Sequence, residues 1–186
     1  MAGRWLKRKG AKNPFRYRAD GAVEIKLTRG KVAIVDAGDL ETMGCQRWYV
    51  VAPFSPRSYA RTRIASSGKT RQKVISLAHF LLKAPKGLIV IYMNSQGLDC
   101  RRCNLRLGNR TNACQKARKR PKTSSRFKGV SWRQHQGKWV SYITADGRRK
   151  HLGCFAGERD AGAAYDEAAL KHFGPFARLN FPQEAV

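Results

Sequence analysis

The sequence has few acidic side chains, no long apolar run and no paired cysteine pattern. Only 12 Asp and Glu residues accompany 38 Lys and Arg residues, which gives 186 residues a formal net charge of +26. No apolar run approaches the roughly 20 residues of a membrane-spanning helix, and no apolar segment follows the charged N-terminus as in a secretory signal. Five cysteines at irregular spacing do not form a secreted disulfide framework. These absences predict a cytoplasmic protein that is not secreted and has no membrane partner.

The excess of positive charge favours a polyanionic partner. A compact body with this net charge repels itself, and phosphate contacts offset that cost because each one releases condensed counterions. Because 42% of the residues are apolar and 10% aromatic, the chain can bury a core and is not a disordered basic tail. We therefore expect a nucleic acid as the partner and no small-molecule substrate.

Composition divides the chain into four segments. Residues 1–20 contain seven basic residues and one acid, and we expect a disordered arm that contacts phosphate. Residues 21–114 have the pattern of an α+β domain. Residues 115–125 contain five basic residues, a proline and a serine pair, which is typical of a linker. Residues 126–182 predict a second compact unit of three strands and one helix.

Short elements fill the 21–114 segment. Runs rich in β-branched and aromatic residues predict strands at 22–27, 31–36, 47–51, 58–63, 73–77 and 88–92, the last of them buried. Apolar residues at helical spacing predict a helix over 77–83, which ends before a Pro-Lys-Gly turn. A second helix is expected within 104–119.

Alternation along residues 138–145 assigns the two faces of the C-terminal sheet. Trp139, Ser141 and Ile143 are predicted to point one way, and Lys138, Val140, Tyr142 and Thr144 the other. Trp139, Ile143 and Leu152 are expected in the core beneath a helix over 158–173. Residues 116–150 contain twelve basic residues and one acid, whereas residues 158–172 contain four acids and two bases. We therefore expect the free face of the sheet to contact DNA, since a β-ribbon fits a major groove about 12 Å wide.

Residues 125–182 resemble the APETALA-two, or ethylene-response-factor, DNA-binding domain. The matching motifs are Lys-Gly-Val at 128–130, Gly-Lys-Trp at 137–139, His-Leu-Gly-Cys-Phe at 151–155, Ala-Ala-Tyr-Asp-Glu-Ala-Ala at 163–169 and Leu-Asn-Phe-Pro at 179–182. The resemblance implies a three-stranded antiparallel sheet packed on one helix, with the sheet in the major groove of double-stranded DNA. It implies that the DNA contacts come from Lys128, Ser131, Arg133, Lys138, Tyr142, Thr144, Arg149 and His151, with Tyr165 reaching phosphate from the helix.

Three of these positions depart from the plant pattern. Ser131, Tyr142 and Thr144 replace the arginine, glutamate and arginine that are usual in the plant transcription factors. Losing an arginine that pairs with guanine costs roughly 1–3 kcal/mol of discrimination. We therefore expect DNA binding to carry over, but not the GC-rich preference of the plant proteins.

The first half of the chain resembles the His-Asn-His homing endonucleases of phage and bacteria. The resemblance covers residues 25–41, 47–51, 58–63 and 75–112. It implies a β-β-α endonuclease unit in which a histidine activates water and acidic and amide side chains hold one divalent cation. It also implies a phage or nucleoid setting for a mobile element.

The catalytic positions of that unit are degenerate. Ile91 replaces the acid and Tyr92 replaces the catalytic histidine; Asn104 is retained, and Ala113 falls at the third position. Isoleucine cannot bind a cation, and tyrosine, with an ordinary pKa near 10, is a poor base at neutral pH. We expect a DNA-binding protein with lost or strongly reduced nuclease activity. The alternatives are an active nickase that uses Asn104 and Mg²⁺ or another divalent cation, and a non-specific architectural protein.

The cysteines suggest a further possible metal site. Cys100 and Cys103 have the two-residue gap of zinc ligands, with Cys114 further along the chain. A fourth ligand is missing nearby, so buried or incidental thiols explain the pattern better. We therefore expect no zinc, no metal site and no cofactor.

Overall fold

The structure is a computed structural model. It describes residues 4–7, 9–10, 12–44, 46–55, 58–66, 69–117, 119 and 123–182. The chain forms two compact units, Met1–Asn109 and Arg110–Val186, and the division lies before the expected linker at 115–125. Within the described residues, no helix has both the length and the apolar character needed to cross a bilayer.

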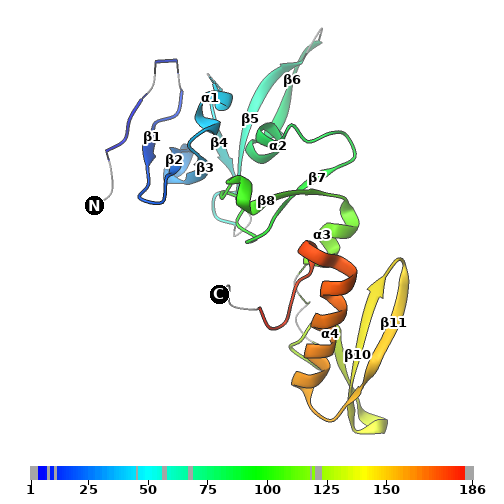
Figure 1. Cartoon of the computed structure of the whole chain (residues 1–186). Helices are drawn as coiled ribbons and strands as arrows, with labels where there is room; N and C mark the ends of the chain where they lie inside the picture. Colours follow the sequence, from blue (N-terminus) through cyan, green and yellow to red (C-terminus); the bar gives the residue numbers. More distant parts are fainter. Residues whose placement is uncertain are drawn as a thin grey trace. The chain divides into compact units, whose positions relative to one another are not determined.

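The N-terminal unit is built mainly from short antiparallel strands (Figure 1). Its first sheet has the order β1 (Phe15–Tyr17), β2 (Ala22–Lys26), β3 (Val32–Asp36), and its second the order β4 (Tyr49–Val51), β5 (Tyr59–Ser66), β6 (Lys69–Ser76). β7 (Ile89–Tyr92) pairs with β8 (Leu105–Gly108). The helical segments are η1 (Thr28–Gly30), α1 (Asp39–Met43), α2 (Leu77–Leu82) and η2 (Arg102–Asn104).

Local chemistry explains where these elements begin and end. The β2–β3 hairpin turns through η1, where Arg29 takes a left-handed conformation with φ +56°. The hydroxyl of Ser76 accepts a hydrogen bond from the His79 N–H and caps α2. Lys83 ends that helix in a left-handed conformation. The core of this unit combines side chains from both sheets and from α2, and it includes Trp48, which is 1% exposed.

Three expectations for this unit differ from the structure. The arm expected to be disordered contains β1, because Phe15 is buried in the core and pairs with Ile25 of β2; residues 1–3, 8 and 11 lie outside the described residues. The stretch expected to start a helix at 104 instead continues as β8, and the helix begins at Arg110. The strand at 88–92 is only half buried, since Ile89 is 37% exposed.

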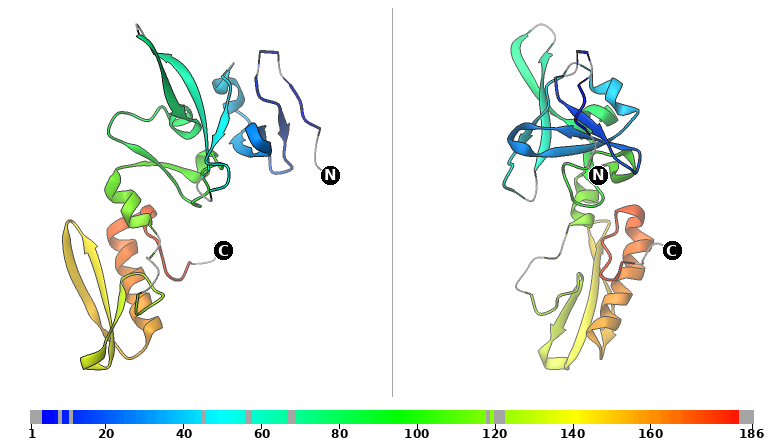
Figure 2. Two further views of the ribbon diagram at one scale, coloured as in Figure 1. Left: turned by 180° about the vertical axis from the view of Figure 1, so that it is seen from behind. Right: turned by 90° about the vertical axis from the view of Figure 1, so that its left-hand side faces the viewer.

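The C-terminal unit is a three-stranded antiparallel sheet packed on one long helix. The helix α3 (Arg110–Lys116) is followed by β9 (Val130–Arg133), η3 (Gln134–Gln136), β10 (Lys138–Ala145), β11 (Arg148–Phe155), α4 (Glu158–Phe173) and η4 (Gly174–Phe176). The sheet has the order β11-β10-β9. Figure 2 shows α4 lying along one face of this sheet. The α+β class expected from the sequence is confirmed.

The core of this unit lies between α4 and the sheet. Ile143 is 1% exposed there, as expected, whereas Trp139 and Leu152 are half-buried at the edges of the core. Val140, expected on the free face, is fully buried together with Ser141. The pairing of β10 with β11 shifts between Ser141 and Tyr142, and such a bulge breaks strict alternation.

Candidate nucleic-acid interface

The outer face of the C-terminal sheet collects most of the residues expected to contact DNA. The pairing places Lys138 opposite Arg133, Tyr142 opposite His151 and Thr144 opposite Arg149. Five of the nine expected residues are exposed, and these are Arg133, Lys138, Thr144, Arg149 and His151. Three of the five carry a fixed positive charge, so this face has the electrostatics of a phosphate-binding surface.

Tyr142 lies at the centre of this face and is half-buried. The guanidinium carbon of Arg149 lies 4.0 Å from the centre of the Tyr142 ring. The Tyr142 hydroxyl accepts a 2.5 Å hydrogen bond from Nη2 of Arg133. The His151 ring lies on the neighbouring strand, with its centroid 5.1 Å from that of Tyr142. One tyrosine therefore contacts cations from both flanking strands.

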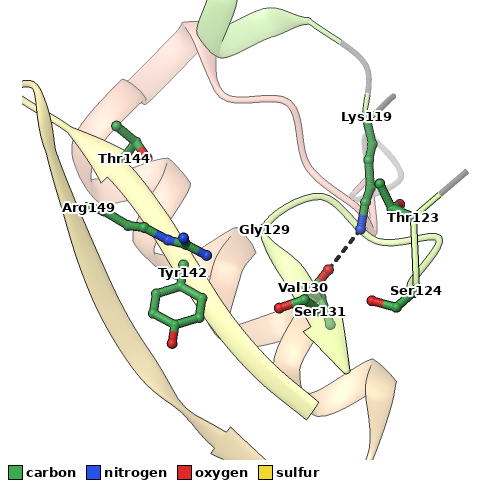
Figure 3. Close-up of a pocket in the computed structure, with 9 residues that line it drawn as sticks. All are labelled: Lys119, Thr123, Ser124, Gly129, Val130, Ser131, Tyr142, Thr144 and Arg149. Carbon is green, nitrogen blue, oxygen red and sulfur yellow. Dashed lines mark hydrogen bonds between the residues drawn. The ribbon is translucent and has the colours of Figure 1, made fainter. Parts of the chain in front are cut away.

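A hollow of about 560 Å³ opens beside Tyr142 (Figure 3). Its lining combines sheet residues with the segment that precedes β9: Lys119, Thr123, Ser124, Gly129, Val130, Ser131, Tyr142, Thr144 and Arg149. Figure 3 shows the Arg149 guanidinium directed toward Tyr142, with Lys119 and Ser124 across the hollow. Ser131, expected at the interface, is half-buried and lines this hollow.

Lys119 fastens the expected linker to the sheet. Its Nζ donates hydrogen bonds to the carbonyl oxygens of Phe127, at 2.5 Å, and Val130, at 2.8 Å. Burial lowers the pKa of this lysine. Positions 118 and 120–122 of this basic linker lie outside the described residues. Lys119 itself is directed to backbone carbonyls.

Lys128 and Tyr165 are less exposed than the five residues named above. The Lys128 Nζ donates to the carbonyl oxygens of Gln115 and Ala117 at the end of α3, and burial lowers its pKa. Tyr165 is 4% exposed and belongs to the core, where burial raises its pKa to about 12. The structure therefore places one expected DNA contact on a helix end and the other beneath the sheet.

A buried carboxylate that sequence reasoning missed supports the interface from below. Asp166 is 8% exposed and accepts hydrogen bonds from the backbone N–H groups of Asn180 and Phe181, at 2.8–2.9 Å. The Asn180 side chain accepts from the Lys128 N–H, at 2.6 Å, and donates to the Lys128 carbonyl. The helix, the C-terminal segment and the turn before β9 are thereby joined. The only sequence signal is an acidic residue within an apolar helical stretch.

The expected endonuclease positions lie around the β7–β8 hairpin. Asn104 is 6% exposed, and both ends of its amide are occupied. Oδ1 accepts from the Asn94 N–H and Nδ2 donates to the Asp99 carbonyl, both at 2.7 Å. Asn104 therefore holds the loop between the two strands. Ala113, expected at the third position, belongs to α3 of the other unit.

The remaining residues at these positions do not fit a divalent cation or a general base. Ile91 is apolar and 6% exposed. Burial raises the pKa of Tyr92, and the neighbouring Cys100 and Tyr59 side chains add to this effect. Because a phenol with a raised pKa stays protonated at neutral pH, it cannot take a proton from water.

An ion pair stabilises the same loop. Arg101 donates to both carboxylate oxygens of Asp99, at 3.0 and 2.8 Å, and Asn94 Nδ2 donates to the second oxygen. Burial alone would raise the pKa of Asp99, but these hydrogen bonds outweigh it and the pKa lies below its usual range. Asp99 is therefore engaged with arginine and amide donors.

The cysteines, expected to be buried or incidental thiols, differ in their exposure to solvent. Cys100 is fully buried, and burial raises its pKa to about 12, so that its thiol stays protonated. Cys103 and Cys114 are exposed. The part of the chain that the structure describes contains no group of three His, Cys, Asp or Glu residues arranged to hold a metal ion.

Comparison with known proteins relates part of the chain to plant transcription factors. A stretch of 73 residues is 45% identical to dehydration-responsive element-binding protein 2A of Arabidopsis thaliana and covers 38% of this chain and 22% of that protein. A stretch of 76 residues is 37% identical to APETALA2-like protein 2 of Oryza sativa subsp. indica. It covers 40% of this chain and 18% of that protein. The similarity is to APETALA2-type proteins.

The match has a limited extent. The AP2-like ethylene-responsive transcription factor TOE2 of Arabidopsis thaliana is 38% identical over 68 residues, which cover 36% of this chain. The chain spans only 14–22% of the length of these three relatives. No family model matches the chain, and no solved structure matches it. The APETALA-two resemblance is confirmed by these relatives, whereas the His-Asn-His resemblance stays a prediction.

Proposed function

We propose that the protein binds double-stranded DNA by laying the outer face of its C-terminal sheet in the major groove. The observation that carries this proposal is the set of exposed cations on that face, Arg133, Lys138 and Arg149, from all three strands. A β-ribbon of this kind enters a major groove, where arginine can pair with guanine. The plant relatives support the proposal, since one is named as an element-binding protein. In this proposal DNA binding requires no cofactor, and the protein is located with DNA in the cytoplasm.

A salt titration of the full chain tests this function. Each neutralised phosphate gives a slope of about −0.9 in log K against log salt concentration. We expect Lys138→Met to reduce the magnitude of the slope by about that amount, because this side chain is exposed on the outer face and its compact ammonium suits a phosphate contact. Leu170→Ala, an exposed change on α4, is the matched control and should leave the slope unaltered. An unchanged slope for Lys138→Met would contradict the proposal.

Competition between a selected duplex and a random one tests sequence preference. We expect the selected duplex to bind more tightly at every salt concentration, since side chains that contact base edges add to the contacts with phosphate. Equal affinity for the two duplexes would favour the non-specific architectural alternative.

A His-Asn-His endonuclease ancestry is part of the proposal for the N-terminal unit, with nuclease activity lost or strongly reduced. Asn104 in the loop of the β7–β8 hairpin is the observation that favours this ancestry. Its amide holds the loop through one accepted and one donated hydrogen bond, while Ile91 and Tyr92 lack the chemistry of a metal ligand and a base.

Incubation of supercoiled plasmid with the protein and Mg²⁺ or Mn²⁺ tests the loss of activity. We expect no metal-dependent nicking above a protein-free control. Nicking that requires the metal and disappears in Asn104→Ala would establish the active-nickase alternative, provided that this variant retains its fold.

A further inference from the structure

The outer face contains one aromatic side chain with two different cation contacts. Tyr142 lies on β10, between Arg133 at the end of β9 and Arg149 on β11. Arg149 stacks on its ring at 4.0 Å, and Arg133 donates to its hydroxyl at 2.5 Å. An exposed arginine normally samples many rotamers, so each contact reduces the freedom that DNA binding would otherwise remove.

Both contacts leave the hydrogen-bonding edges of the guanidiniums available. The Arg149 guanidinium lies over the Tyr142 ring, and a cation held by the face of a ring spends no N–H donor on a hydrogen-bond acceptor. The bond to Tyr142 uses one N–H of Arg133, and the other donors of its planar fork remain. A planar pair of N–H donors is the group that binds the O6 and N7 acceptors of guanine in the major groove.

We propose that Tyr142 is a positioning residue that holds Arg133 and Arg149 ready for two guanines of one binding site. This inference rests on the proposed DNA-binding function and deepens it. Tyr142 acts through the two arginines, and the resulting preference is for duplexes with two closely spaced guanines.

The distances limit the spacing of those guanines. The guanidinium carbons of Arg149 and Arg133 lie 4.0 and 5.9 Å from the same ring centre. They are therefore no more than about 10 Å apart, which is about three base steps at 3.4 Å each. Lys138 lies opposite Arg133 and has a flexible stem and a point charge, which suits phosphate rather than a base edge.

Two substitutions in the full chain separate the contacts. Tyr142→Phe removes the hydroxyl that Arg133 bonds and keeps the ring on which Arg149 stacks. Tyr142→Leu removes both. Tyr17→Phe, a change at a tyrosine that is 55% exposed in the N-terminal unit, is the matched control. Circular dichroism and thermal unfolding establish that each variant is folded.

Selection of bound duplexes from a random pool, followed by competition binding at one salt concentration, measures the preference. We expect the wild-type chain to enrich two guanines at most three steps apart. Tyr142→Phe should lose roughly 5-fold or more of the preference at one guanine and retain the other. Tyr142→Leu should lose preference at both, and Tyr17→Phe at neither.

The outcomes distinguish this inference from the function beneath it. If the wild-type chain enriches no motif and has no advantage over random duplex, the proposed sequence readout itself fails. If it enriches a motif that Tyr142→Phe and Tyr142→Leu enrich with equal preference, the DNA-binding proposal stands and the positioning role is wrong. If the Tyr142 variants unfold at a lower temperature but select the same motif, Tyr142 contributes to stability and does not position the arginines. Should Tyr142→Leu fail to fold, the selective loss expected of Tyr142→Phe decides the question.

Discussion

Replacing Gly129 by alanine tests how the DNA-binding face is supported. Gly129 precedes β9 in a left-handed conformation with φ +79°, which L side chains rarely adopt. A Cβ at this position would lie 2.0 Å from Cδ2 of the Tyr165 ring and 2.7 Å from the Tyr142 carbonyl oxygen. The backbone therefore approaches the helix and the central strand too closely for any side chain.

The expected cost has two parts. A non-glycine residue in the left-handed region costs roughly 1–2 kcal/mol, and overpacking a core adds about 1–3 kcal/mol. The sum, about 2–5 kcal/mol, is a large share of the roughly 5–15 kcal/mol that stabilises an ordinary domain. Gly137→Ala is the matched control, because Gly137 has φ +59° and a methyl group added there would meet nothing within 4 Å. It should cost only the backbone part.

Hydrogen exchange of the amides in β10 and α4, measured by mass spectrometry on the full chain, reports the local stability of the C-terminal unit. Both variants should exchange faster there than wild type, and Gly129→Ala by about 1–3 kcal/mol of opening free energy more than Gly137→Ala. Equal protection in the two variants would refute the close packing of Gly129 against Tyr165. It would also reopen the possibility that Tyr165 faces outward.

Two further predictions concern charged side chains. Lys128→Met should leave the salt slope of DNA binding unchanged, because the Lys128 Nζ donates to the carbonyls of Gln115 and Ala117. A decrease of about 0.9 in the magnitude of the slope, as expected for the loss of a phosphate contact, would contradict this. Asp99→Asn should lower the free energy of unfolding by at least about 1.5 kcal/mol at neutral pH, since it removes a hydrogen-bonded ion pair. The pKa of Asp99 is lowered by folding, so its contribution is present above the unfolded pKa near 4 and is lost as the pH falls through the folded pKa. The difference between wild type and Asp99→Asn in urea unfolding should therefore shrink below about pH 4, and a difference independent of pH would be evidence against the ion pair.

Local patterns predicted the strands and helices well where packing follows a simple period. The β2–β3 hairpin and the helix α4 lie where apolar spacing and turn residues placed them. The fully buried Val140 was missed because its burial depends on the shifted pairing of β10 with β11. A register shift is a property of two strands together, so one strand's alternation does not contain it.

Only part of the candidate site was predictable from the sequence, because some of its contacts depend on how separate segments pack together. The sequence identifies Arg133, Lys138 and Arg149 as cations on strands, and their exposure agrees with the expected outer face. It does not distinguish them from Lys128, because the carbonyls that bind the Lys128 ammonium are brought there by folding. Nor does it reveal that the space beside Gly129 is occupied by Tyr165.

These differences change what the net charge means for binding. If all twelve basic residues between 116 and 150 contacted phosphate, the salt slope would approach about −11. Lys119 and Lys128 donate to backbone carbonyls within their own unit, which removes about 1.8 from that value. In the N-terminal unit, Arg18 and Arg101 are likewise paired with carboxylates. The number of cations available to DNA is therefore smaller than the sequence count, and Arg133, Lys138 and Arg149 are the ones exposed on the outer face.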